Sequence, residues 1–178
     1  KGVGALYIRQ KDPRIQLQPI MYGGGHERGI RSGTLPVPNI VGMGKACEIS
    51  QHVMTKESGT IQFLRDALMS MILKNIPKSN VNGSMEKRLP GNLNMSFPGM
   101  NNEAIIAAVP EIAISSGAAC TSSTMEASHV LLALGLSKND AYSSLRFGIG
   151  RFNTVKDIET AAASIMRCME KRQKMSYA

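Results

Sequence analysis

Helix-like and strand-like patterns alternate along the 178-residue chain, and this alternation most restricts its fold. Apolar residues recur every three or four positions in residues 59–75 and 155–169, as on the buried face of a helix. Residues 92–97 and 144–150 instead have the patterns of strands. The alternation predicts an α/β or α+β protein. Further helices are expected over residues 40–54, 102–109 and 126–134, and further strands over residues 3–8 and 112–114. Asn102 and Thr154 are the expected caps of the helices that they begin.

Composition and charge narrow the class of protein. The hydrophobic fraction is 43% and the charged fraction 19%, as in an ordinary globular protein. The net charge is +8, but the basic residues are spread out and are not interleaved with aromatic residues. A solvated basic surface therefore explains the charge better than a nucleic-acid site does. No apolar run approaches the ~20 residues that a membrane-spanning helix needs. We therefore expect neither nucleic-acid binding as the core function nor a membrane association.

The three cysteines are Cys47, Cys120 and Cys168. They form neither a CxxC pair nor a Cys/His cluster with the spacing of a zinc site. An odd number of cysteines also argues against a disulfide framework and favours a reducing compartment. Cys47 and Cys168 lie in helix-like segments, where a free cysteine is usually a small buried hydrophobe. We therefore expect no chemistry from these two.

Cys120 lies in a different setting, a run of small residues over positions 114–123. Serine, glycine and alanine build little core, so this thiol is expected to be accessible. A cysteine acts as a nucleophile through its thiolate and needs a neighbour that lowers its pKa. His26 and His129 are candidates for that neighbour, although sequence separation does not tell how far they lie from the thiol.

Two further features suit an anionic ligand. Residues 23–34 contain five glycines, two arginines, a serine and a threonine, which favours an anion-binding loop or, equally, a flexible surface loop. The segment is not a Walker A loop. Arg146 lies in an apolar strand-like run, where we expect it on the buried side. Its guanidinium would bind a ligand carboxylate or phosphate, or form an internal salt bridge to Asp or Glu.

Five segments of the chain occur together in one known family, in the same order and at similar spacing: residues 2–7, 23–29, 31–34, 115–122 and 143–152. With these segments the chain resembles the C-terminal half of NifS/IscS-type cysteine desulfurases. These are pyridoxal-phosphate enzymes of fold type I in the class V aminotransferase group. The resemblance implies an α/β fold in which residues 1–53 end the large cofactor-binding domain and residues 54–178 form the small α+β domain.

The resemblance also implies a reaction and a set of site residues. In the family, L-cysteine is converted to L-alanine and its sulfur becomes a persulfide on an enzyme cysteine, for iron–sulfur cluster assembly. By this match Cys120 is the nucleophile, Arg146 binds the substrate carboxylate, and Thr34 contacts the phosphate of pyridoxal 5'-phosphate in the neighbouring subunit. The implied partners are therefore a second copy of the chain and an iron–sulfur scaffold protein as sulfur acceptor. No metal site is expected in the chain itself, although Cys120 could contact an iron–sulfur cluster during transfer.

The chain departs from the family in lacking the residues that hold the cofactor ring, including the cofactor lysine, which lie upstream. We therefore expect a fragment that is inactive alone, from a bacterial cytoplasm or a mitochondrial matrix. One alternative is a non-catalytic sulfur-acceptor or scaffold-binding module. A cysteine hydrolase using Cys120 and His129 is a weaker alternative, because His129 is expected in the following helix and no orienting Asp or Asn is evident.

Overall fold

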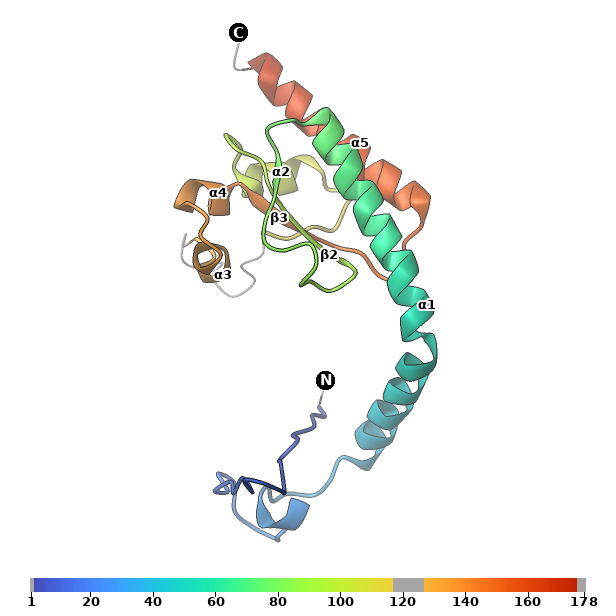
Figure 1. The fold of residues 1–178 in the computed structure, drawn as a ribbon, viewed down its shortest axis with the longest axis vertical. Coiled ribbons are helices and arrows are strands. Elements are labelled where there is room, and N and C mark those ends of the chain that lie inside the picture. Colours follow the sequence, from blue (N-terminus) through green and yellow to red (C-terminus); the bar gives the residue numbers. More distant parts are fainter. Residues whose placement is uncertain (1, 117–126, 176–178) are drawn as a thin grey trace. The chain divides into compact units, whose positions relative to one another are not determined.

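The computed structural model describes residues 2–116 and 127–175, in which helices and strands alternate (Figure 1). By their contacts the residues divide into two compact units, Lys1–Met54 and Thr55–Ala178. Assigning residues 1–53 and 54–178 to two domains of a larger enzyme remains a prediction. The elements are η1 (Glu27–Gly29), α1 (Val37–Asn75), β1 (Asn80–Val81), β2 (Asn92–Ser96), α2 (Asn102–Ala108), α3 (His129–Ala133), α4 (Lys138–Tyr142), β3 (Ser144–Gly148) and α5 (Val155–Met175). None of the described helices is long and apolar enough to cross a membrane.

The second unit is built on a three-stranded antiparallel sheet in the order β1-β2-β3. In β2 and β3, Leu93 pairs with Phe147 and Met95 pairs with Leu145, and all four side chains are buried. Successive side chains of a strand point to opposite faces. The alternation therefore gives the sheet one apolar face and one face that carries more polar residues.

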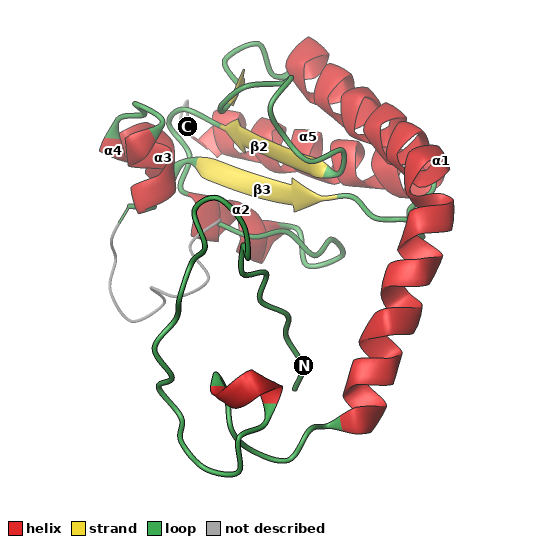
Figure 2. Ribbon diagram, turned by 60° about the horizontal axis from the view of Figure 1, so that its bottom comes forward, coloured by secondary structure: helices red, strands yellow, loops and turns green. Residues whose placement is uncertain are grey.

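Two long helices cover the apolar face of this sheet. The second half of α1 and all of α5 run side by side there (Figures 1 and 2). Their buried residues have the helical spacing expected from the sequence, with Leu64, Leu68 and Ile72 on α1 and Ile158, Ala162, Ile165 and Met169 on α5. Because they belong to the same apolar cluster as the strands, the helices and the sheet form one core.

The ends of two helices follow from capping chemistry. The predicted cap of α5 is confirmed, because the hydroxyl of Thr154 accepts the Asp157 backbone N–H at 3.3 Å. The cap of α2 is Asn101 rather than the predicted Asn102, and its side chain accepts the Ala104 backbone N–H at 3.1 Å. In both helices a side-chain oxygen accepts an N–H of the first turn. The cap of α2 therefore differs from the prediction by one position only.

Four predicted elements differ in the structure. The two helices expected over residues 40–54 and 59–75 are a single helix, α1. Residues 3–8 form no strand, and their apolar side chains are largely exposed, as Leu6 and Tyr7 show. Residues 112–114 form no strand either, and only Ser115 makes an isolated bridge, to Arg146. A strand needs a neighbour for its backbone hydrogen bonds, and the described residues provide none for 3–8.

Candidate functional site

Arg146 lies on β3, but not on the buried side that was predicted. Its neighbours Leu145 and Phe147 are buried in the core, whereas the side chain of Arg146 is exposed. The alternation of the strand therefore turns the guanidinium away from the core. Among the described residues no carboxylate pairs with it, which removes the internal salt bridge as its explanation there. An exposed guanidinium is available to a ligand carboxylate.

The backbone of Arg146 binds the segment that leads to Cys120. Its N–H donates to the carbonyl of Ser115 at 2.7 Å, and the Ser115 N–H donates to the carbonyl of Arg146 at 3.2 Å. This bridge places Ser115 beside Arg146 on the edge of β3 opposite β2. Cys120 itself lies outside the described residues. It follows Ser115 by five positions, and five residues of fully extended chain span at most about 18 Å.

A buried polar network supports the beginning of β3. The side-chain amide of Asn82 donates to Asn94 Oδ1 at 2.6 Å and to Ser144 Oγ at 2.9 Å. The Ser144 hydroxyl donates to the carbonyl of Asp140 at 2.6 Å, and Asn102 donates to the carbonyl of Ser144 at 3.3 Å. Such satisfied buried networks specify one arrangement of the elements they join.

Sequence reasoning missed this network. The sequence did contain a signal. Asn94 and Ser144 are polar residues within predicted strands, and such residues often make buried hydrogen bonds. Their partners could not be inferred, because Asn82 and Ser144 are 62 positions apart.

Thr34 ends the glycine-rich loop in the first unit. Met21 and Arg31 form an isolated parallel bridge, and the N–H of Ser32 donates to the carbonyl of Met21 at 3.4 Å. Ser32 is buried, whereas Thr34 is exposed. The loop is therefore anchored at Ser32 and presents the hydroxyl residue that follows.

The backbone of this loop needs its glycines at particular points. Gly33 has φ of +123°, and a Cβ there would lie 2.9 Å from Nη1 of Arg31. Its N–H donates to Nδ1 of His26 at 3.4 Å. Glu27 and Arg28 are not glycines, yet they have φ of +50° and +60°. Non-glycine residues in this left-handed region are uncommon and often occur where a loop has a function.

The structure describes the surroundings of Thr34 and of Arg146 separately, because the two residues belong to different units. His26 lies in the glycine-rich loop, and His129 is the exposed first residue of α3. Neither can be placed relative to the thiol of Cys120. The described residues hold no group of three His, Cys, Asp or Glu side chains that could bind a metal ion.

The other two cysteines differ from each other. Cys47 is exposed on α1, so the prediction that it is a buried hydrophobe is wrong. Val41 and Ile49 on the same part of α1 are exposed too, so the described residues do not cover this stretch of helix. Cys168 is half-buried and packs against the core. Burial raises the pKa of its thiol, against the opposing charges of Arg172 and Lys171, which agrees with an unreactive role.

Comparison with known proteins agrees with the resemblance found in the sequence. A family model described as aminotransferase class-V matches residues 1–160. The chain is 50% identical over 175 residues to the cysteine desulfurase IscS of Ehrlichia chaffeensis, covering 98% of this chain and 43% of that protein. It is 48% identical over 176 residues to the cysteine desulfurase IscS of Rickettsia typhi, covering 99% of this chain and 43% of that protein. The chain thus spans less than half the length of these relatives.

Solved structures support the fold assignment. The crystal structure of a NifS-like protein from Rickettsia africae matches with a TM-score of 0.75 and 28% identity, over 88% of this chain and 41% of that one. Another structure titled NifS-like protein matches with a TM-score of 0.77 and 28% identity, over 92% and 41% of the two chains. The predicted α/β fold of part of a NifS-like enzyme is confirmed. With the family model covering most of its residues, the chain belongs to the aminotransferase class-V family.

Proposed function

We propose that this chain is part of a cysteine desulfurase that converts L-cysteine to L-alanine and stores the released sulfur on Cys120. The proposal is supported by 50% identity to a protein named cysteine desulfurase, over nearly the whole of this chain. Arg146 and Thr34 are its other two site residues. The sulfur then passes to an acceptor protein, for which an iron–sulfur scaffold is the expected class.

The observation that carries this proposal is the backbone pairing of Ser115 with Arg146. The two hydrogen bonds of the bridge, of 2.7 and 3.2 Å, together fix Ser115, at the start of the segment that leads to Cys120, beside β3. A carboxylate bound at Arg146 would therefore lie within the possible range of a thiol five residues beyond Ser115. A desulfurase needs this combination, because one substrate molecule carries both the carboxylate and the sulfur.

The loop around Thr34 fits the phosphate of pyridoxal 5'-phosphate. Thr34 is exposed, and neither Arg28 nor Arg31 nearby has an ion-pair partner among the described residues. Hydroxyl and guanidinium groups are the usual ligands of phosphate oxygens. When bound, the cofactor supplies an electron sink that weakens the bonds around the substrate's α- and β-carbons. The residues that hold its ring are expected outside these 178 residues.

The chain's own residues then have distinct tasks. Arg146 holds the substrate carboxylate with two parallel N–H donors and so orients the molecule. The Cys120 thiolate forms an S–S bond to the substrate sulfur while the carbon–sulfur bond breaks. The electron pair of the broken bond remains on the carbon skeleton, which takes up a proton and leaves as alanine. Cys120 is left as a persulfide.

This reaction is tested in the full-length protein that contains the chain, supplied with pyridoxal phosphate and L-cysteine. We expect alanine to form and mass spectrometry to find the extra sulfur on Cys120. Cys120→Ser should lose both signals, whereas the matched variant Cys47→Ser should keep both. Alanine formation with the persulfide on another cysteine would contradict the assignment. Sulfur uptake from an added persulfide donor without any alanine would favour the acceptor-module alternative.

A homodimer with shared sites follows if Thr34 binds the cofactor phosphate of the neighbouring subunit. Co-expressed Thr34→Ala and Arg146→Gln chains would then form hybrid dimers with one intact site and one doubly altered site. Random pairing in a two-fold dimer predicts about a quarter of wild-type activity, even if each variant alone is inactive. Hybrid dimers without activity would show instead that Thr34 and Arg146 act within one subunit.

A further inference from the structure

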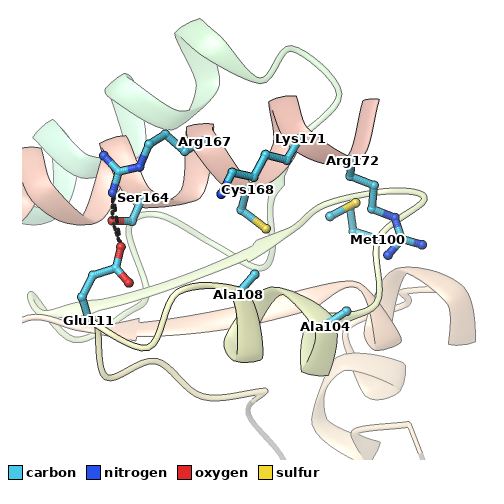
Figure 3. Close-up of a pocket in the computed structure, with 9 residues that line it drawn as sticks. All are labelled: Met100, Ala104, Ala108, Glu111, Ser164, Arg167, Cys168, Lys171 and Arg172. Atoms are coloured by element: carbon cyan, nitrogen blue, oxygen red, sulfur yellow. Dashed lines mark hydrogen bonds and ion pairs between the residues drawn. The ribbon is translucent and has the colours of Figure 1, made fainter. Parts of the chain in front are cut away.

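A half-open cavity lies between α2 and α5, within the second unit. Its volume is about 770 Å³, and none of its lining residues is a site residue of the proposed desulfurase. Figure 3 shows side chains from both helices projecting into the space between them. The lining residues are Met100, Ala104, Ala108, Glu111, Ser164, Arg167, Cys168, Lys171 and Arg172.

The apolar wall of the cavity arises from small side chains. Ala104 and Ala108 lie one turn apart on α2, so their methyl groups face the same side. Opposite them, the Cys168 thiol points from α5 toward α2 (Figure 3). Burial raises the pKa of this thiol and keeps it neutral, so it belongs to the apolar wall. Two methyl groups and a thiol leave space that larger side chains would fill.

The charges around the cavity are unbalanced. Three basic side chains line it, namely Arg167, Lys171 and Arg172, with a single carboxylate, Glu111. Glu111 accepts hydrogen bonds from the Ser164 hydroxyl and from Arg167 Nη2, the latter at 3.3 Å. These contacts, led by the Ser164 bond, lower the pKa of Glu111 and keep it charged. The pair formed by Glu111 and Arg167 is therefore neutral overall.

A second basic side chain, Lys171, lies beside the apolar wall of the cavity. Lys171 is exposed, and no carboxylate among the described residues pairs with it. Its side chain runs toward Cys168, whereas Arg172 lines the opposite end of the cavity, next to Met100 (Figure 3). An apolar wall therefore continues into a cationic rim. This polarity suits a ligand with an apolar body and a negatively charged head.

We propose that this cavity binds a small organic anion with an apolar body, of the class of medium-chain carboxylates. The volume lies within the usual range of small-molecule sites, about 300–1,000 Å³. The body packs against Ala104, Ala108 and the Cys168 thiol, and the carboxylate is bound by Lys171. The proposal does not depend on the desulfurase assignment, because the two sites share no residue.

Cys168 provides a reporter inside the cavity. In the full-length protein, we measure alkylation of each cysteine by iodoacetamide with and without octanoate, using peptide mass spectrometry. Octanoate at three times its dissociation constant should slow alkylation of Cys168 about fourfold, because only the empty cavity reacts. Cys47, exposed on α1, should react at an unchanged rate and serves as the internal control.

Matched variants separate the apolar and ionic contributions. Ala104→Leu fills the cavity and should abolish octanoate binding in calorimetry, whereas Ala107→Leu, exposed on the same helix and outside the lining, should bind normally. Lys171→Gln should raise the half-protecting octanoate concentration about two- to fivefold, as expected for an exposed ion pair.

Three outcomes would overturn the proposal. One is the absence of protection and of heat of binding with octanoate at millimolar concentration. Another is equal protection by neutral octanol, which would remove the role of the charge. The third is protection by an acidic amphipathic peptide but not by octanoate, which would make the cavity a protein-docking groove instead.

Discussion

Replacing Arg146 with glutamine should remove substrate recognition with little effect on folding. The side chain is exposed, and the described residues place no carboxylate against it, so its loss should change the free energy of unfolding by less than about 0.5 kcal/mol. If it holds the L-cysteine carboxylate, the variant loses charge-assisted hydrogen bonds worth about 1.5–3 kcal/mol. That loss lowers kcat/KM roughly 10- to 150-fold. Leu145→Ala should instead destabilise the fold, lowering the free energy of unfolding by about 2–5 kcal/mol, because Leu145 is fully buried.

The assay compares alanine formation and urea unfolding of these variants in the full-length protein with its cofactor. Arg146→Lys is the matched control, because it keeps the charge but loses the planar pair of donors. Its kcat/KM should fall between those of the wild type and of Arg146→Gln. A value for Arg146→Gln within twofold of wild type would refute the carboxylate role. Destabilisation of that variant by more than about 2 kcal/mol would show that Arg146 has a structural partner that the described residues do not include.

Three further predictions concern other parts of the chain. Gly91→Ala should lower the melting temperature, because a Cβ there would lie 2.0 Å from the carbonyl oxygen of Ile149. Overpacking of this kind costs about 1–3 kcal/mol. An unchanged melting temperature would show that the backbone near Gly91 and Ile149 can shift without cost. Cys120→Ser should stop alanine formation while L-cysteine still perturbs the cofactor absorbance, and loss of that spectral change would assign the residue to substrate binding instead. Hydrogen bonds from the Thr154 backbone and hydroxyl lower the pKa of Asp157, so its contribution to stability is present at neutral pH and disappears as the pH falls through that lowered value. Asp157→Asn should therefore flatten the acid side of the stability profile in urea titrations, and a profile of unchanged slope would contradict this linkage.

Elements with a complete local pattern could be predicted from the sequence. The alternation over residues 92–97 and the apolar run around Leu145 correspond to β2 and β3, and the helical spacing after Thr154 corresponds to α5. The single helix α1 was divided in the prediction, although neither proline nor glycine occurs between Met54 and Gly59 to end a helix there.

Features that depend on distant partners could not be predicted. The side of β3 on which Arg146 lies is set by pairing with β2, where its partner is the distant residue Asn94. The contact of Asn82 with Ser144 is equally non-local. The resemblance to known desulfurases supplied roles for Cys120, Arg146 and Thr34. It did not supply the bridge from Ser115 that relates two of them.

The two parts of the proposed site have different physical requirements, and the chain meets them differently. A carboxylate anchor must hold its geometry, and the backbone around Arg146 is fixed by β2 on one edge, by Ser115 on the other, and by the buried contacts of Ser144 two residues earlier. A sulfur carrier must meet first its substrate and then an acceptor, so it benefits from a segment with little side chain to pack, such as the Ser, Gly and Ala residues before Cys120. Because two backbone hydrogen bonds attach Ser115 to β3, the small side chains of that segment do not weaken these bonds. The sequence thus combines a fixed start of the segment at Ser115 with small residues before the thiol that carries the sulfur.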